Sequence, residues 1–142
     1  MKKIEIFIPG TPVAKQRVKS RMGGKGKIIS TTPKKTVQYE QHVRNCIMEQ
    51  ITESLPIWEK GVPLKLTADF MFLRPESVRK GKNRREYHIV KPDCDNLLKS
   101  IADAGNTLLY HDDSQIMIVE MSKTYTEDPR EEGVLFDIEE IK

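Results

Sequence analysis

Four aspartates fall into two tight groups in the second half of the chain. Asp93 and Asp95 lie two residues apart, and Asp112 and Asp113 are adjacent a short way further on. Carboxylates held close together repel each other unless a positive charge lies between them. A hard divalent cation such as Mg²⁺ binds oxygen ligands of this type. In an otherwise basic chain, a carboxylate-bound Mg²⁺ indicates phosphate chemistry on nucleic acid.

A lysine follows the first group at helical spacing. Lys99 comes four residues after Asp95, so a helix in this segment places both on one face. A surface ion pair, worth about 0.2–0.5 kcal/mol, explains the same spacing without chemistry. Asp93 alone is better explained as a helix N-cap, and an Asp-Asp pair before a strand is often a turn. The hypothesis of a catalytic site therefore depends on the combination of the two groups.

Taken together, these acids could form one metal site. Asp93, Asp95 and one of Asp112 or Asp113 would supply three oxygen ligands and leave positions for water and a phosphate oxygen. The metal would lower the pKa of a bound water and stabilise charge on the phosphate oxygens. Lys99 would orient that water, or neutralise the leaving 3′ oxygen or the scissile phosphate. The predicted reaction is hydrolysis of a phosphodiester.

Positive charge is concentrated in two segments. Residues 15–35 contain eight lysines and arginines and no acid, and residues 74–91 contain seven against two glutamates. The tail of the chain is acidic and offsets much of this positive charge. The net charge is therefore only +3, although the charges are expected to be unevenly distributed over the surface. Such a surface can dock on a polyanion. The side chains predicted to contact DNA are Lys15, Arg17, Lys19, Arg21, Lys34, Lys35, Arg84, Arg85 and Lys91.

Several other classes of function lack support. No Gly-x-x-x-x-Gly-Lys-Ser/Thr run is present, which argues against an NTPase. Cys46 and Cys94 are too few for a disulfide framework or a zinc site, and both are expected to be reduced thiols. No apolar run approaches the roughly 20 residues that span a bilayer, and the N-terminus has no apolar signal-peptide region. We therefore expect no membrane partner and a cytoplasmic location.

Hydrophobic periodicity predicts four strands and two main helices in the order β-α-β-α-β-β. The strands are expected at residues 2–8, 64–72, 116–125 and 134–138, and the helices from Thr32-Pro33 to before Pro56 and from residue 93 or 94 to Gly105. Residues 13–31 and 75–90 are expected to be basic loops. This order favours an α/β (α+β-like) fold with a mixed sheet of about four strands, in one domain over residues 1–142.

Three segments, together with this order of elements, match a known pattern. They are residues 9–17 (PGTPVAKQR) leading to 32–36 (TPKKT), residues 91–99 (KPDCDNLLK) and residues 109–116 (LYHDDSQI). In these segments the chain resembles the RusA family of Holliday junction resolvases, which are small divalent-metal endonucleases common in phages and prophages. The second and third segments are fairly specific at this spacing, and the first is looser.

The resemblance implies a catalytic set and a mode of action. The essential aspartates of the family fall on Asp93, Asp95 and Asp113, which would hold the metal, and its essential lysine falls on Lys99. Mg²⁺ is the implied cofactor, with Mn²⁺ as a substitute, and a homodimer with one site per subunit is the implied assembly. One departure from the pattern is the run at residues 17–19, Arg-Val-Lys, where many members carry Arg-Pro-Arg.

The leading hypothesis is a Mg²⁺-dependent endonuclease that resolves four-way DNA junctions in recombination and repair. One alternative is a non-catalytic DNA-binding or architectural module in which the acids only cap and pair. A second alternative is a metal nuclease that acts on other branched DNA, such as flaps, or on RNA.

Overall fold

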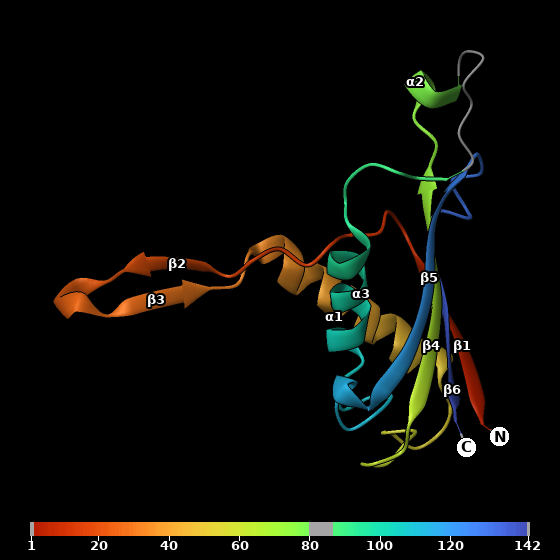
Figure 1. Ribbon diagram of the computed structural model, residues 1–142, viewed down its shortest axis with the longest axis horizontal. Coiled ribbons are helices and arrows are strands. Elements are labelled where there is room, and N and C mark those ends of the chain that lie inside the picture. Colours follow the sequence, from red (N-terminus) through yellow and green to blue (C-terminus); the bar gives the residue numbers. More distant parts are fainter. Residues whose placement is uncertain (1, 80–86, 142) are drawn as a thin grey trace.

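The computed structural model describes residues 2–79 and 87–141 (Figure 1). Its centre is a four-stranded sheet in the order β1-β6-β4-β5. The strands are β1 (Lys3–Pro9), β4 (Leu64–Leu73), β5 (Ile116–Thr126) and β6 (Gly133–Glu140). β6 pairs antiparallel with β1 and β4, whereas β4 and β5 run parallel. The mixed sheet of four strands confirms the predicted fold class.

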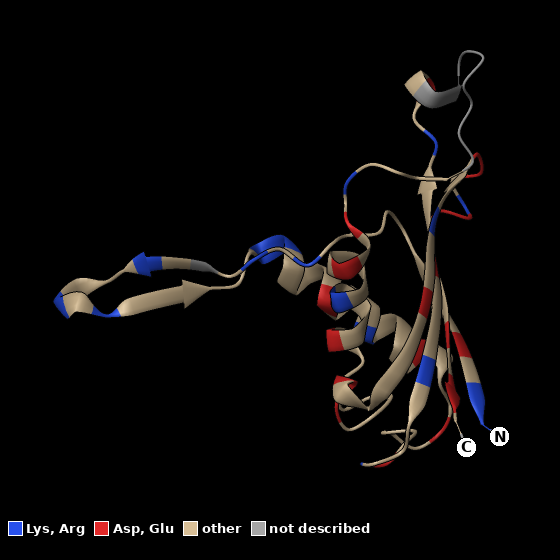
Figure 2. Ribbon diagram, in the orientation of Figure 1, with Lys and Arg blue, Asp and Glu red and all other residues tan. Residues whose placement is uncertain are grey.

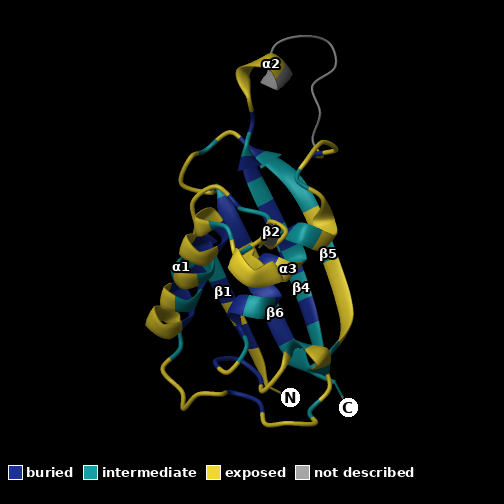
Figure 3. Cartoon of the chain, turned by 90° about the vertical axis from the view of Figure 1, so that its left-hand side faces the viewer, coloured by how far each residue is buried: buried dark blue, intermediate teal, exposed yellow. Residues whose placement is uncertain are grey.

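Two helices cover one face of this sheet (Figures 1 and 3). They are α1 (Lys34–Gln50) and α3 (Cys94–Ala104), the two main helices that the periodicity predicted. Every second residue of β4 is buried against them, because alternate side chains of a strand point to the same face. α3 contributes the predicted apolar stripe of Leu97, Ile101 and Ala104, all nearly inaccessible to solvent. The core therefore holds α3 firmly against the sheet.

The turn that follows α3 packs tightly against the end of that helix. Gly105 is its C-cap, and a Cβ added there would lie 2.6 Å from the Tyr110 hydroxyl oxygen. The Tyr110 ring is fully buried, and its hydroxyl donates a hydrogen bond to the Ala102 carbonyl. This close approach folds residues 105–110 back over the helix and so fixes the start of the next segment, which carries Asp112 and Asp113.

The expectation of a loop over residues 13–31 is wrong for its second half. Residues 19–31 form a two-stranded antiparallel hairpin, here called the arm, made of β2 (Lys19–Met22), the short 3₁₀ turn η1 (Gly24–Gly26) and β3 (Ile28–Thr31). The arm extends away from the rest of the molecule (Figure 1). Its few, mostly polar residues have no hydrophobic periodicity to reveal them, because the hairpin buries no face.

The second expected loop, residues 75–90, begins with the short helix α2 (Glu76–Arg79). Two of the predicted DNA contacts, Arg84 and Arg85, lie outside the described residues. Cys46 is buried and Cys94 is exposed, and both are free thiols, as predicted. Among the helices described, none is both long and apolar enough to cross a membrane.

Candidate active site and nucleic-acid groove

The segment before the arm runs between the two main helices and is held to both. The Lys15 backbone N–H donates to the Asn96 carbonyl of α3 at 2.9 Å, and the Gln16 N–H donates to the Thr36 hydroxyl of α1 at 3.1 Å. These bonds place the Lys15 ammonium beside two acids. It donates a short hydrogen bond to the Asp103 carboxylate and lies 3.4 Å from a Glu40 carboxylate oxygen.

Asp103 in turn faces Asp113, the first residue of the 3₁₀ turn η2 (Asp113–Gln115). A hydrogen bond shared between these two carboxyl groups raises the pKa of Asp113 to about 6, and partial burial and the Asp103 charge add to the effect. Lys15 opposes the rise without cancelling it. Asp113 and Asp103 also line a small cavity of about 180 Å³ together with Lys99. One of the predicted metal ligands and the predicted essential lysine thus meet at one place.

Asp103 was missed by the sequence interpretation, although a signal was present. Asp95, Lys99 and Asp103 follow one another at intervals of four residues, and such residues share one face of a helix. Figure 2 shows the acidic residues of α3 grouped around the basic one. The contact with Asp113 could not be inferred, since it depends on how the chain folds back after Gly105.

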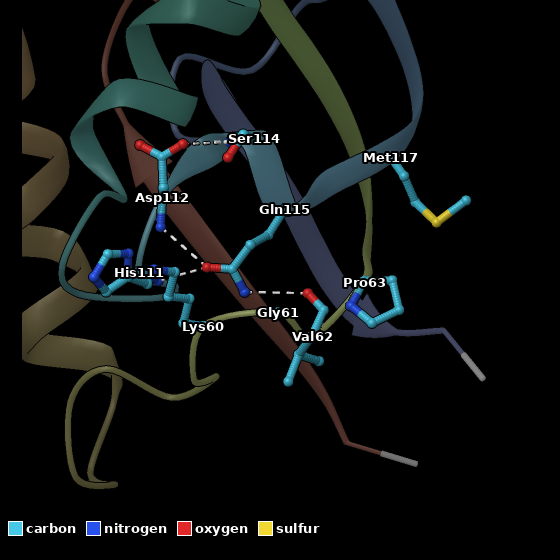
Figure 4. Close-up of a pocket in the computed structure, with 9 residues that line it drawn as sticks. All are labelled: Lys60, Gly61, Val62, Pro63, His111, Asp112, Ser114, Gln115 and Met117. Atoms are coloured by element: carbon cyan, nitrogen blue, oxygen red, sulfur yellow. Dashed lines mark hydrogen bonds between the residues drawn. The ribbon is translucent and has the colours of Figure 1, made fainter.

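Asp112 has a different role from its neighbour. It is the N-cap of η2, and its carboxylate accepts a hydrogen bond from the Ser114 N–H at 3.0 Å. Hydrogen bonding from the Ser114 side chain, and then from its backbone, lowers the pKa of Asp112. In return the Gln115 side-chain oxygen accepts from the N–H groups of Asp112 and His111 (Figure 4). This reciprocal capping box explains Asp112 without chemistry.

A hollow of about 430 Å³ lies on the capping side of η2 (Figure 4). Its lining includes Asp112 but neither Asp113 nor Lys99, so it is separate from the acidic contact described above. The Gln115 amide donates across it to the Val62 and Glu59 carbonyls, at 3.1 and 2.8 Å. We interpret this hollow as part of the scaffold that holds η2 in place.

Asp93 and Asp95 lie at the opposite end of α3 from Asp103. Asp93 occupies the N-cap position with extended backbone, yet its side chain makes no capping hydrogen bond. Asp95, in the first turn, forms no ion pair with Lys99, and all three side chains are exposed. Neither structural explanation offered by the sequence, a capping carboxylate or a surface ion pair, is therefore realised among the described residues. Both carboxylates keep their oxygens available.

The donors fit a hard cation in type, because every candidate ligand is a carboxylate oxygen and two of the candidates have no partner in the part of the chain described. The raised pKa of Asp113 also shows that Asp103 and Asp113 lie close enough to repel each other when both are charged, and a cation between them would relieve that repulsion. No group of three or more His, Cys, Asp or Glu side chains among residues 2–79 and 87–141 is already arranged to hold a metal. The structure thus places Asp113 next to Asp103 and Lys99, whereas Asp93 and Asp95 lie at the opposite, N-terminal end of α3.

A groove of about 670 Å³ adjoins the N-terminal end of α3. Asp93 and Asn96 line it, with Phe72 and Pro92 among its apolar walls. Four of the side chains predicted to contact DNA also line it: Lys15, Arg17, Lys35 and Lys91. The groove therefore combines positive charge with one of the candidate metal ligands. We call it the basic groove.

The remaining predicted DNA contacts lie nearby or in the arm. Lys34 is exposed at the first turn of α1, next to the basic groove, and Arg21 is exposed in β2. Lys19 begins the arm. Figure 2 shows the basic residues of the first turn of α1 and of the arm on the side of the molecule that carries α3. Lys15 is the exception, since its ammonium is already engaged by Asp103 and Glu40.

Comparison with known proteins identifies the family to which this chain belongs. A protein of Bacillus subtilis (strain 168), described as uncharacterized protein YqaN, is 29% identical over 142 residues, covering 95% of this chain and 96% of the relative. The crossover junction endodeoxyribonuclease rusA of Lactococcus phage r1t is 37% identical over 74 residues, which is 51% of this chain and 53% of the phage protein. The family model for endodeoxyribonuclease RusA matches residues 9–132. The match includes the basic groove, both ends of α3 and η2, and the chain belongs to the RusA family of Holliday junction resolvases, endodeoxyribonucleases that hydrolyse phosphodiester bonds.

Proposed function

We propose that this protein is a Mg²⁺-dependent endonuclease that resolves four-way DNA junctions in the cytoplasm, as a homodimer with one site per subunit. Asp93, Asp95 and Asp113 are the proposed metal ligands, and Lys99 is the proposed catalytic lysine. The observation that carries the proposal is the basic groove. It places an uncapped carboxylate, Asp93, among cationic side chains that suit a phosphodiester backbone.

The cations of the basic groove would bind and orient the DNA strand. Arg17, Lys35 and Lys91 line it from three different segments, so one phosphate backbone can contact all three. Contacts of this kind fix the register of the DNA and carry no sequence information, and they weaken as salt rises. Lys34 and Arg21 would extend the same path along α1 and the arm.

Lys99 is the group of this chain best suited to act on the reacting phosphate. Its ammonium has no ion-pair partner among the described residues, so it can approach an incoming anion without first breaking a bond. A bound Mg²⁺ supplies a water of lowered pKa and an electrostatic partner for the phosphate oxygens. In the net reaction, water adds to phosphorus and the 3′ oxygen leaves with a proton. Lys99 would stabilise the negative charge on that leaving oxygen.

Lys15 and Asp103 would act on the site indirectly. Lys15 pairs with Asp103, and Asp103 holds Asp113 through the shared hydrogen bond. These two successive contacts, Lys15 to Asp103 and Asp103 to Asp113, would orient Asp113, which is one of the proposed ligands. The proposed homodimer would suit the reaction, since two sites related by a twofold axis match paired nicks in strands of like polarity.

Cleavage of a synthetic four-way junction tests the proposal. Wild-type protein should nick two opposed strands in Mg²⁺ or Mn²⁺, whereas Asp95→Asn and Lys99→Ala should still bind the junction but lose cleavage by about 10²-fold or more. Asp112→Asn is the matched control, because asparagine also caps a helix and Asp112 has no proposed catalytic part. Binding without nicking over a range of divalent metals would contradict the enzymatic proposal.

Two further measurements separate the alternatives. Calorimetric titration with Mg²⁺ or Mn²⁺ should give heat of binding that Asp93→Asn abolishes, while a purely architectural module would show no such difference. Comparison of four-way junctions with flaps and branched RNA measures the substrate preference. Faster cleavage of flaps or RNA than of junctions would replace the proposed substrate.

A further inference from the structure

The arm is an isolated hairpin with an apolar tip. Its two strands pair only with each other and belong to no larger sheet. All four side chains of β3 are exposed, as are Ser20, Arg21 and Met22 of β2. A single two-stranded hairpin is marginally stable in water, and large exposed apolar side chains normally indicate a binding surface. The arm therefore needs an explanation beyond the fold.

Two of the three large apolar side chains of the arm share one face, and the third, Ile29, lies on the other. Met22 lies directly opposite Ile28 in the last pair of the ladder, so both point to the same side. Each is 71% exposed, more than any other described large apolar side chain. The Ser20 and Ser30 hydroxyls lie 3.3 Å apart two pairs further back on the same face, and the pair between them, Arg21 and Ile29, lies on the other face. The tip is thus a small apolar pair carried at the end of a polar ribbon.

The surroundings of this pair are basic and lead back to the basic groove. Lys25 and Lys27 lie in and just after the η1 turn, and both are exposed. Residues 15–35 contain no acid, so the whole arm complements a polyanion. At its base the arm begins two residues after Arg17, which lines the basic groove. DNA held in the groove would therefore lie next to the arm.

Proteins that insert apolar side chains between bases carry this combination of features. A methionine, leucine, isoleucine or phenylalanine enters between two bases and partly unstacks them, at a cost of a few kcal/mol per step, while cations hold the adjacent phosphates. A two-stranded ribbon is also narrow enough to enter a groove of DNA. At the branch point of a junction the stacking of bases is already interrupted, so the cost of insertion is lowest there.

We propose that the arm inserts Met22 and Ile28 between bases at the branch point of a four-way junction, while Arg21, Lys25 and Lys27 hold the flanking phosphates. The inference rests on the proposed function, because it takes the junction as the substrate of the basic groove. The inference adds that the arm favours branched over linear DNA because bases at a branch point unstack at a lower free-energy cost.

The experiment measures base stacking directly. A junction carrying 2-aminopurine beside the branch point emits more strongly when that base unstacks, and an Asp95→Asn background keeps the DNA uncut. Saturating protein should raise the emission by about twofold or more. In the same background, Met22→Ala/Ile28→Ala should lose the rise, and Met22→Leu/Ile28→Leu should keep it. Val37→Ala/Met48→Ala is the matched control, since it removes two exposed apolar side chains from α1.

The charges of the arm are tested separately. Lys25→Gln/Lys27→Gln should lower the slope of log affinity against log salt by about 1.8, yet retain the emission rise at saturation. An unchanged rise in Met22→Ala/Ile28→Ala would overturn the proposal. The proposal would also be overturned if the wild-type protein is a dimer and Met22→Ala/Ile28→Ala converts it to monomers, because the tip would then contact a second copy of the chain. A wild-type protein that resolves junctions without any rise refutes the inference and leaves the proposed function intact. A rise in protein that never cleaves supports the inference and counts against the enzyme.

Discussion

The Lys15 ammonium and the Asp103 carboxylate form an ion pair that joins the segment before the arm to α3, across 88 positions of the sequence. Their hydrogen bond raises the pKa of Lys15 above its ordinary value. The two side chains are 28% and 27% exposed, so water screens the pair only in part. This pair connects the segment that lines the basic groove to the acidic residues of α3, and the first prediction concerns it.

Lys15→Met should destabilise the protein by about 1–2 kcal/mol, between the values for exposed and for buried ion pairs. Urea denaturation of Lys15→Met, Asp103→Asn and the double variant measures the coupling. Lys2→Met is the matched control, because the Lys2–Glu53 pair is 42% and 46% exposed and should cost less than about 1 kcal/mol. Strictly additive single-variant effects would show that the Lys15–Asp103 contact carries no free energy.

The second prediction concerns the carboxyl group of Asp113. In the metal-free protein it should titrate near pH 6, which is detected by carbon-13 NMR of the side chain. Asp103→Asn removes the partner charge, and the pKa of Asp113 should move back toward the ordinary value of 3.8. A titration of Asp113 that Asp103→Asn leaves unmoved would assign the raised pKa to burial and to the Asp112 charge instead of to Asp103.

The same shift makes the stability of the metal-free protein depend on pH. The folded-state pKa is above the unfolded value, so between about pH 4 and pH 6 the folded state binds more protons than the unfolded state. The free energy of unfolding should therefore fall as pH rises through this window, and Asp113→Asn should remove that contribution. Divalent metal competes with the proton, so its affinity should rise across the same window. Denaturation and metal titration at several pH values measure both trends.

A third prediction uses the tight turn after α3. Gly105→Ala should destabilise the protein by about 1–3 kcal/mol, because its Cβ would lie 2.6 Å from the Tyr110 hydroxyl in a packed interior. Movement of the turn should also displace Asp113 and reduce cleavage. Gly24→Ala is the matched control, since a Cβ at Gly24 meets nothing within 4 Å. Thermal unfolding of both variants gives the comparison, and equal melting temperatures would contradict the packing argument.

A fourth prediction concerns the basic groove. Arg17→Gln, Lys35→Gln and Lys91→Gln should each lower the slope of log affinity against log salt by about 0.9, because each removes one phosphate contact. Lys60→Gln removes an exposed charge from the hollow beside η2 and should leave the slope unchanged. Binding of a labelled junction over a series of salt concentrations measures the slopes. Equal slopes for all four variants would place the DNA elsewhere.

Hydrophobic periodicity predicted the parts of this molecule that bury a face. The stripe of Leu97, Ile101 and Ala104 located α3, and the alternation in residues 64–72 located β4. The arm has no buried face, so the same rule predicted a loop. Its structure depends on local features, the turn at Gly24–Gly26 and the paired strands around it.

In the candidate site, too, the sequence predicted the local relationships but not the long-range contacts. Asp93, Asp95 and Lys99 are close in sequence, and their relative positions follow from the geometry of one helix. The partnership of Asp113 with Asp103, and that of Asp103 with Lys15, depends on long-range packing that no spacing rule contains. The separate role of Asp112 was visible only once the Ser114 and Gln115 hydrogen bonds were known.

The pairing of β1 with β6 places Lys3 opposite Glu139, so the two ends of the described chain lie side by side (Figure 1). They meet at the edge of the sheet, away from the arm and the first turn of α3. A short glycine-serine linker could join these ends, and the ring could be reopened in the 51–63 connection to make a circular permutant. A dye or surface tether attached at the ends of the described chain would likewise leave the basic groove and the arm unobstructed.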